Sequence, residues 1–139
     1  MQVITATIAI STQGFSDIID ITAEVEDAVR NSGIQAGTVT VFVSGSTAGV
    51  TTIEYEPGLL KDLPEAFEKI APQSQRYHHD ATWGDGNGFS HVRAAMLGCS
   101  LTVPFTNQRL LLGTWQQIVI IDFDNRPRNR EIALQIIGS

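Results

Sequence analysis

The sequence contains a single cysteine, Cys99, among 139 residues. One thiol forms no intrachain disulfide and supplies too few ligands for a zinc finger, so neither device is expected to stabilise the fold. Basic charge is also scarce, with nine Lys and Arg against fifteen Asp and Glu and a net charge of −6. Because nucleic-acid-binding proteins present a basic surface to the phosphate backbone, this balance argues against nucleic acid as a partner.

Long hydrophobic runs are absent as well. No stretch approaches the ~18 apolar residues that a membrane helix needs, and the opening MQVITATIAIST alternates and has no basic leader region. We therefore predict no membrane partner and a location in the cytoplasm, whose reducing conditions suit one free cysteine. With 42% hydrophobic residues, the composition fits one globular domain over residues 1–139.

Hydrophobic periodicity predicts an α+β fold. Alternating or β-branched segments predict strands at 4–10, 14–21, 37–45 and 50–56, and helical spacing predicts helices at 21–33 and 59–70. Five more strands are predicted at 91–97, 100–105, 109–113, 116–123 and 130–138, with TNQR and DNRPRN as hairpin turns. The expected architecture is a mostly antiparallel β-sheet with two helices packed on one face.

Two segments of the sequence have an unusual composition. The segment QQIVIIDF is apolar at every position from Ile118 to Ile121, which is typical of a strand buried on both faces. We expect the second covering layer to come from a neighbouring subunit. Residues 71–88, APQSQRYHHDATWGDGNG, show no period and predict a long loop, and long loops in small domains are commonly functional.

All three histidines lie in this loop or directly after it. Alternation along 91–97 places His91 and Arg93 on one face of the predicted strand, where Arg suits a phosphate or carboxylate and His acts as acid, base or ligand. An exposed polar sheet face explains the same pair without a ligand. A histidine beside Asp80 and near His91 forms either a general acid/base group or two ligands of a divalent ion. The pattern leaves open whether His78 or His79 faces this site.

Small, amide and aromatic side chains complete the candidates. Asn87 lies in the glycine-rich GDGNG segment, whose backbone is free to approach a ligand closely or to form a plain tight turn. Ser46 and Thr47 lie in a turn between two strands that can present N–H groups to an anion. Trp115 and Gln116 precede the apolar strand, where the ring either stacks on a planar ligand or joins the core.

Taken in order, the motifs STAG, YEPG, HHD, DGNG-SH-RA-MLG, SLTVPF, GTWQQ and RE-ALQIIG resemble the YjbQ-like family over about residues 37–137. The resemblance implies an α+β fold that assembles as a homotrimer, with polar pockets near the subunit boundaries. It also implies a thiamine-phosphate synthase activity, a transferase reaction that joins a pyrimidine diphosphate to a thiazole phosphate. A small phosphorylated metabolite is then the expected partner.

The resemblance also assigns roles to individual residues. It implies His79, Asp80 and His91 as catalytic residues, with His79 and His91 as ligands of a divalent metal ion, Mg²⁺ or Zn²⁺. The implied ligand-binding residues are Ser46, Thr47, Asn87, Arg93, Trp115 and Gln116. Many members carry a histidine where Gly45 and Phe89 stand, so this chain lacks two potential ligands. Two other readings stay open: a non-catalytic trimer that binds a metabolite or metal, and a structural trimer whose polar loop caps a sheet edge.

Overall fold

The computed structural model describes residues 1–139, which form eight strands and four helices. In chain order these are β1 (Gln2–Thr12), β2 (Asp17–Asp20), α1 (Thr22–Ser32), β3 (Gly37–Val43), β4 (Ala48–Ile53), α2 (Pro57–Ile70), α3 (His78–Trp83), α4 (Gly88–Leu97), β5 (Ser100–Thr106), β6 (Arg109–Leu110), β7 (Gln117–Asp122) and β8 (Arg128–Gly138). The α+β class is confirmed, but four helices replace the predicted two. None of these helices has the length and apolar character needed to span a membrane.

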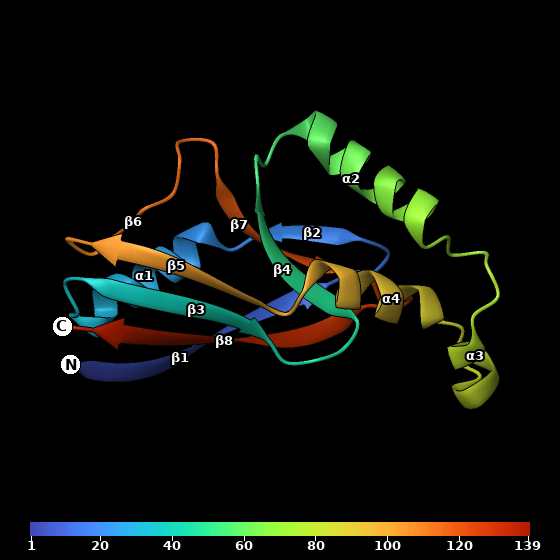
Figure 1. The fold of residues 1–139 in the computed structure, drawn as a ribbon, viewed down its shortest axis with the longest axis horizontal. Helices are drawn as coiled ribbons and strands as arrows, with labels where there is room; N and C mark the ends of the chain where they lie inside the picture. Colours follow the sequence, from blue (N-terminus) through green and yellow to red (C-terminus); the bar gives the residue numbers. More distant parts are fainter.

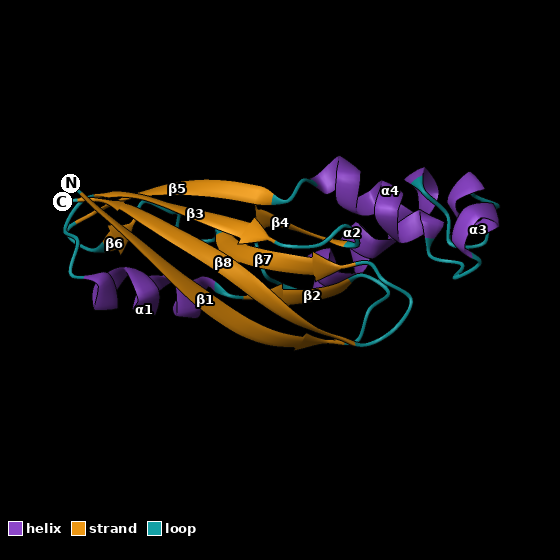
Figure 2. Cartoon of the chain, turned by 90° about the horizontal axis from the view of Figure 1, so that it is seen from below, coloured by secondary structure: helices purple, strands orange, loops and turns teal.

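The strands form two antiparallel sheets. The larger has the order β1-β8-β3-β5-β6 and the smaller the order β2-β7-β4. Figures 1 and 2 show α1 beneath the larger sheet, and α2 and α4 beyond the smaller one, with α3 at the end farthest from both termini. The chain is therefore layered, with the larger sheet on one outer side and α2 and α4 on the other.

Strand β7 is the centre of the core. Its side chains Ile118 and Ile120 are fully buried in the main hydrophobic cluster, which includes residues of β3 and β8. On the opposite face, Val119 and Ile121 pack with Phe67 of α2 and other apolar side chains in a second cluster. The predicted burial on both faces is confirmed. The expectation that a neighbouring subunit supplies the second layer is wrong, because α2 and α4 of the same chain supply it.

The two predicted hairpins have different outcomes. Residues 105–110 form a hairpin between β5 and β6, with Asn107 and Gln108 at positive φ values of 51° and 60°, as a two-residue turn with the twist of the strands requires. Strand β6 is shorter than the predicted 109–113. The DNRPRN turn is not a hairpin, since it carries the chain from β7 in the smaller sheet to β8 in the larger.

The segment from 57 to 97 is more helical than predicted. Helix α2 begins where the Glu56 carboxylate caps the N–H groups of Gly58 and Leu59, with Pro57 in the first turn. The predicted loop at 71–88 contains α3, and the predicted strand at 91–97 is part of α4. The buried residues of α4 recur at helical spacing, as Phe89, Ser90, Arg93 and Ala94.

Candidate metal and ligand site

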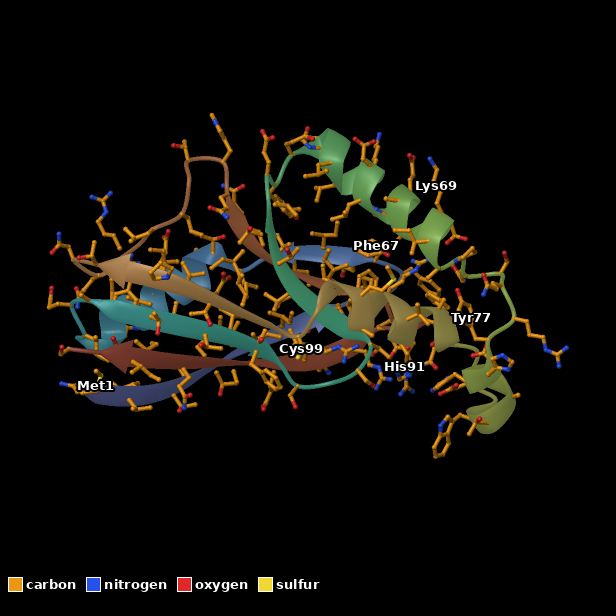
Figure 3. All side chains as sticks on the ribbon, in the orientation of Figure 1. Met1, Phe67, Lys69, Tyr77, His91 and Cys99 are labelled. Carbon is orange, nitrogen blue, oxygen red and sulfur yellow. The ribbon has the colours of Figure 1, made fainter.

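The packing of α3 against α4 brings two histidines together. His79 on α3 and His91 on α4 have ring centroids 4.2 Å apart, whereas His78 is exposed. Figure 3 shows His91 on α4, and Tyr77 directly precedes α3. The approach depends on Gly88, where a Cβ atom would lie 2.5 Å from the Cβ of Tyr77. The structure therefore selects His79 as the histidine that pairs with His91.

Two carboxylates lie next to this histidine pair. The Nδ1 atom of His79 is 3.8 Å from Oδ1 of Asp80 and 3.7 Å from Oδ1 of Asp85. One potential ligand atom from each of these three residues lies within 4.8 Å of the others. Asp80 is held in place because its Oδ1 accepts a hydrogen bond of 2.9 Å from the Gly88 N–H. We call His79, Asp80, Asp85 and His91 the histidine–carboxylate cluster.

Two buried polar atoms in this region have no hydrogen-bond partner, His79 Nδ1 and Asn87 Oδ1. Asn87 is 5% exposed and its amide nitrogen donates to Asp124 at 3.2 Å, so its oxygen is left without a donor. Buried polar atoms are nearly always paired in native proteins. The unpartnered Nδ1 atom of His79, within the cluster, indicates a position where a ligand completes the bonding.

The environment also sets the charge of His91. Burial lowers the pKa of the imidazole and the adjacent His79 lowers it further, against the opposing effect of Asp124, Asp85 and Asp80. The pKa therefore lies below its ordinary value, and His91 is neutral at pH 7. A neutral imidazole is the form that binds a metal ion or accepts a proton.

His91 also lines a cavity of about 350 Å³. The cavity is bounded by the turn before β4, by α4 and by the turn into β5, with the lining residues Gly45, Ser46, Ala48, His91, Ala94, Ala95, Gly98 and Cys99. Its volume is in the range of small-molecule sites. Ser46 and His91, both predicted from the sequence, meet here, and Figure 3 shows Cys99 at the opposite end of α4 from the histidine pair.

A buried ionic network lies next to this region. Arg130 forms a two-pronged contact with Asp122, with Nε–Oδ2 and Nη2–Oδ1 distances of 2.8 and 3.0 Å. Arg128 Nε donates to Asp124 at 2.8 Å. Thr47 is buried in the same network, where it donates to Asp124 and accepts from Arg130. The sequence identified Thr47 as a ligand-binding residue, but its hydroxyl is occupied by protein partners.

The sequence predicts Asp80, but it does not single out three other carboxylates of this region, Asp85, Asp122 and Asp124. Asp85 was visible in the glycine-rich segment, and Asp122 and Asp124 follow directly on the most apolar strand of the chain. Both of the latter side chains are 0% exposed. An acidic residue at the end of a fully buried strand needs a buried partner, and this signal would have pointed to the arginines of the DNRPRNR turn.

The prediction that His91 and Arg93 share a face is wrong. In a helix, residues two apart point in different directions, and Arg93 is only 4% exposed. Its guanidinium donates to the Ala71 carbonyl, the Ser16 hydroxyl and the Glu68 carboxylate at 3.0, 3.2 and 2.7 Å. Arg93 therefore joins α4 to the end of α2 and to the turn before β2, away from the cavity.

Trp115 and Gln116 also lie apart from the cluster. Gln117 pairs with Ile53 at one end of the β4–β7 ladder, whereas Asp122 pairs with Ala48 at the other, which separates the two ends by about 17 Å. Trp115 is 71% exposed, and Gln116 bonds Thr52 and Gly113. Within one chain, these two predicted ligand-binding residues do not join the histidine–carboxylate cluster.

This two-sheet α+β architecture is shared with solved structures of other small proteins. A family model described as "UPF0047 protein YjbQ-like" matches residues 6–139. The chain belongs to this family.

Its relatives share both sequence and fold. A UPF0047 protein of Methanothermobacter thermautotrophicus is 38% identical over 138 residues, covering 99% of this chain and 94% of the relative. The UPF0047 protein YugU of Bacillus subtilis is 33% identical, covering 95% and 98%. A crystal structure of a protein of unknown function from Sulfolobus solfataricus has a TM-score of 0.94 at 32% identity, covering 99% of each chain.

Proposed function

We propose that the protein binds a divalent metal ion at the histidine–carboxylate cluster and uses this site to bind a small phosphorylated metabolite. The observation that carries the proposal is the unpartnered, buried Nδ1 atom of His79, which faces two carboxylates at 3.7 and 3.8 Å. These separations exceed a hydrogen bond. They are close to the ~3.4 Å expected between two ligands of one tetrahedral ion.

The residues present fit such an ion in charge and in chemistry. His79, Asp80 and Asp85 supply one nitrogen and two oxygen ligands, and the neutral imidazole of His91 lies beside them. Imidazole suits Zn²⁺, and carboxylates suit Mg²⁺ and Mn²⁺. When bound, the ion would neutralise phosphate charge and polarise a phosphoryl oxygen.

The specific reaction proposed is thiamine-phosphate synthesis. In it, the bond between the methylene carbon of the pyrimidine substrate and the pyrophosphate oxygen breaks, and its electron pair leaves with pyrophosphate. The lone pair of the thiazole nitrogen forms the new bond to this methylene carbon, which gives a thiazolium cation. A site of this kind must hold a diphosphate and neutralise its charge as it leaves. The proposal is supported by the cavity of about 350 Å³, which would hold the diphosphate, and by the cluster, whose bound ion would neutralise its charge. A non-catalytic metabolite-binding protein is the second candidate, favoured by the absence of a strongly basic side chain from the cavity lining.

Calorimetric titration of the chelator-treated protein with Mg²⁺, Mn²⁺ and Zn²⁺ tests the metal site. We expect Asp85→Asn and His79→Ala to weaken binding of the preferred ion by about tenfold or more. His78→Ala is the matched control, because this neighbouring histidine is exposed and its loss leaves binding unchanged. Equal affinities in the His78 and His79 variants would refute the site.

Turnover separates the two candidate functions. The purified protein is supplied with the pyrimidine diphosphate, the thiazole phosphate and its preferred ion, and thiamine phosphate is measured. We expect formation that disappears in His91→Ala while the melting temperature is kept. Metal and phosphate binding without any product would instead establish the non-catalytic binding protein.

We also propose that the chain forms a homotrimer through the outer face of its larger sheet. The alternate residues of β1, β8, β3 and β5 on this face are exposed or partly exposed. They are mostly small, hydroxylated or apolar, with two amides, and only Glu131 among them is charged. They are Val3, Thr5, Thr7, Ala9, Ser11, Thr38, Thr40, Phe42, Ser100, Thr102, Pro104, Thr106, Asn129, Glu131, Ala133, Gln135 and Ile137. A sheet face with so little charge is typical of one that packs against protein.

A further inference from the structure

One nitrogen of the Arg130 guanidinium has no hydrogen-bond partner in the protein. Its Nε and Nη2 atoms contact Asp122, and Nη2 also donates to the Thr47 hydroxyl at 2.6 Å. Its Nη1 atom donates to no protein acceptor in the structure, although the residue is only 9% exposed. The two-pronged contact with Asp122 fixes the direction of this remaining donor, as planar Arg–carboxylate pairs do.

Gly45 lies directly beside this free donor. A Cβ atom at position 45 would lie 2.9 Å from Arg130 Nη1, and the residue has a φ of +147°. Any other residue there would therefore cover the donor. Gly45 also lines the cavity next to Ser46 and His91, so the absence of a side chain leaves Nη1 open toward that space.

The turn itself adds further donors. None of the hydrogen bonds of the turns and loops has the N–H of Ser44, Gly45 or Ser46 as its donor. Consecutive N–H groups in a turn are a common way to bind an anion. The turn that carries these three N–H groups therefore lies beside Arg130 Nη1 at Gly45.

The charged side chains of the network cancel one another, so a bound anion needs a positive charge from elsewhere. Arg128 and Arg130 are balanced by Asp124 and Asp122, so the network has no net charge to attract an anion. The positive charge must then come from the ion bound at the cluster, on the other side of His91. Arg130 supplies hydrogen-bond direction, which distinguishes a tetrahedral phosphate from a diffuse anion.

We infer that Arg130 Nη1 and the Ser44–Ser46 turn form a phosphate-binding subsite of the cavity, which accepts a phosphate monoester whose organic part lies against Ala94 and Ala95. This inference rests on the proposed function, because the metal ion completes the charge balance. It assigns phosphate recognition to Arg130 and not to Arg93, whose guanidinium is occupied by Ala71, Ser16 and Glu68.

Cys99 reports on this subsite, because it is the only cysteine, is exposed and lines the same cavity. The rate of alkylation by iodoacetamide is measured in the Mn²⁺-loaded protein at increasing inorganic phosphate, with chloride at equal ionic strength as the reference. Mn²⁺ is chosen because it binds thiolates weakly. We expect phosphate to slow alkylation in the wild type.

Two variants and one control identify the donor. Gly45→Ala covers Nη1 and Arg130→Lys removes it, and each is expected to raise the half-protecting phosphate concentration by about tenfold. Arg126→Ala removes an exposed arginine of the segment between β7 and β8 and leaves protection unchanged. If Arg130→Lys fails to fold, Gly45→Ala still gives the answer, because it keeps every charge of the network.

The outcomes separate this inference from the proposed function. Mn²⁺ binding measured on the same samples is expected to be equal in the wild type and in Gly45→Ala. If Mn²⁺ binds but phosphate does not protect Cys99 of the wild type, the subsite alone is overturned. The same conclusion follows if phosphate protects Cys99 equally in the wild type and in Gly45→Ala. Absence of Mn²⁺, Mg²⁺ and Zn²⁺ binding in the wild type overturns the proposed metal site.

Discussion

At the scale of single residues, Asp124 joins the ionic network to the candidate site. Burial raises its pKa, but hydrogen bonds from Asn125, Asn87, Arg128 and Thr47 outweigh this effect and lower the pKa below its ordinary value. Because the folded-state pKa is lower than the unfolded one, ionised Asp124 stabilises the fold at neutral pH. This stability is lost as the pH falls through the folded-state pKa.

We therefore predict that Asp124→Asn lowers the free energy of unfolding by about 3 kcal/mol at pH 7, since it leaves Arg128 without its buried partner. The difference from the wild type should shrink below about pH 4, where the wild-type carboxylate also becomes protonated. Urea unfolding of both proteins across this range measures it. Parallel pH dependences of the two proteins would show that Asp124 is not the group that titrates.

Residue identities were easier to predict than residue directions. His79, Asp80, Asn87 and His91 were chosen by chemical type, and the structure brings them together. Arg93 has equally suitable chemistry, but its side chain points into the protein, because residues 91–97 form a helix where the sequence predicts a strand. Side-chain chemistry is readable from the sequence, whereas direction follows only after the secondary structure is correct.

At the scale of elements, α4 shows why that step failed. Its buried positions have helical spacing, but Ser90 and Arg93 are polar, so hydrophobicity alone does not show the period. The apolar residues that remain alternate closely enough to resemble a strand. Helix α3 has only six residues and none of them is buried, so it has no hydrophobic periodicity to detect.

The contact between these two helices is predicted to control metal binding. Gly88→Ala would place a Cβ 2.5 Å from Tyr77 Cβ and 3.0 Å from Asp80 Oδ1, which forces α3 away from α4 and separates His79 from His91. We expect the affinity for the preferred ion to fall by about tenfold. The melting temperature should change little, because α3 buries no residue.

Gly113→Ala provides a matched control for this change. It adds the same methyl group to a loop where the nearest atom is 3.8 Å away, so metal affinity should stay at the wild-type value. Calorimetric titration of the wild type, Gly88→Ala and Gly113→Ala with the preferred ion measures the three affinities. Unchanged affinity in Gly88→Ala would mean that the cluster does not need the α3–α4 contact.

At the scale of the whole molecule, the predicted order of strands along the chain is largely confirmed. The sequence does not predict that these strands divide into two sheets. Doubly buried β7 was correctly identified from its composition. The sequence contains no local signal that the turn after β7 crosses to the other sheet, because sheet membership depends on contacts between distant segments. For the same reason, the composition of β7 predicts burial on both faces but does not show that α2 and α4 of the same chain cover the second face.

The outer face of the larger sheet is predicted to form the contact between the subunits of a trimer. Light scattering should give a mass of about 45 kDa, three times the 15.1 kDa of the chain, as a closed trimer requires. Phe42 is 42% exposed in the middle strand of this face, and Phe42→Asp should dissociate the trimer, because it buries a charge in the contact. Ile70→Asp, at a 58% exposed position on α2, should leave the mass unchanged. A monomeric wild-type protein would refute the trimer, whereas a trimer that survives Phe42→Asp and is lost in Ile70→Asp would place the assembly surface on another face.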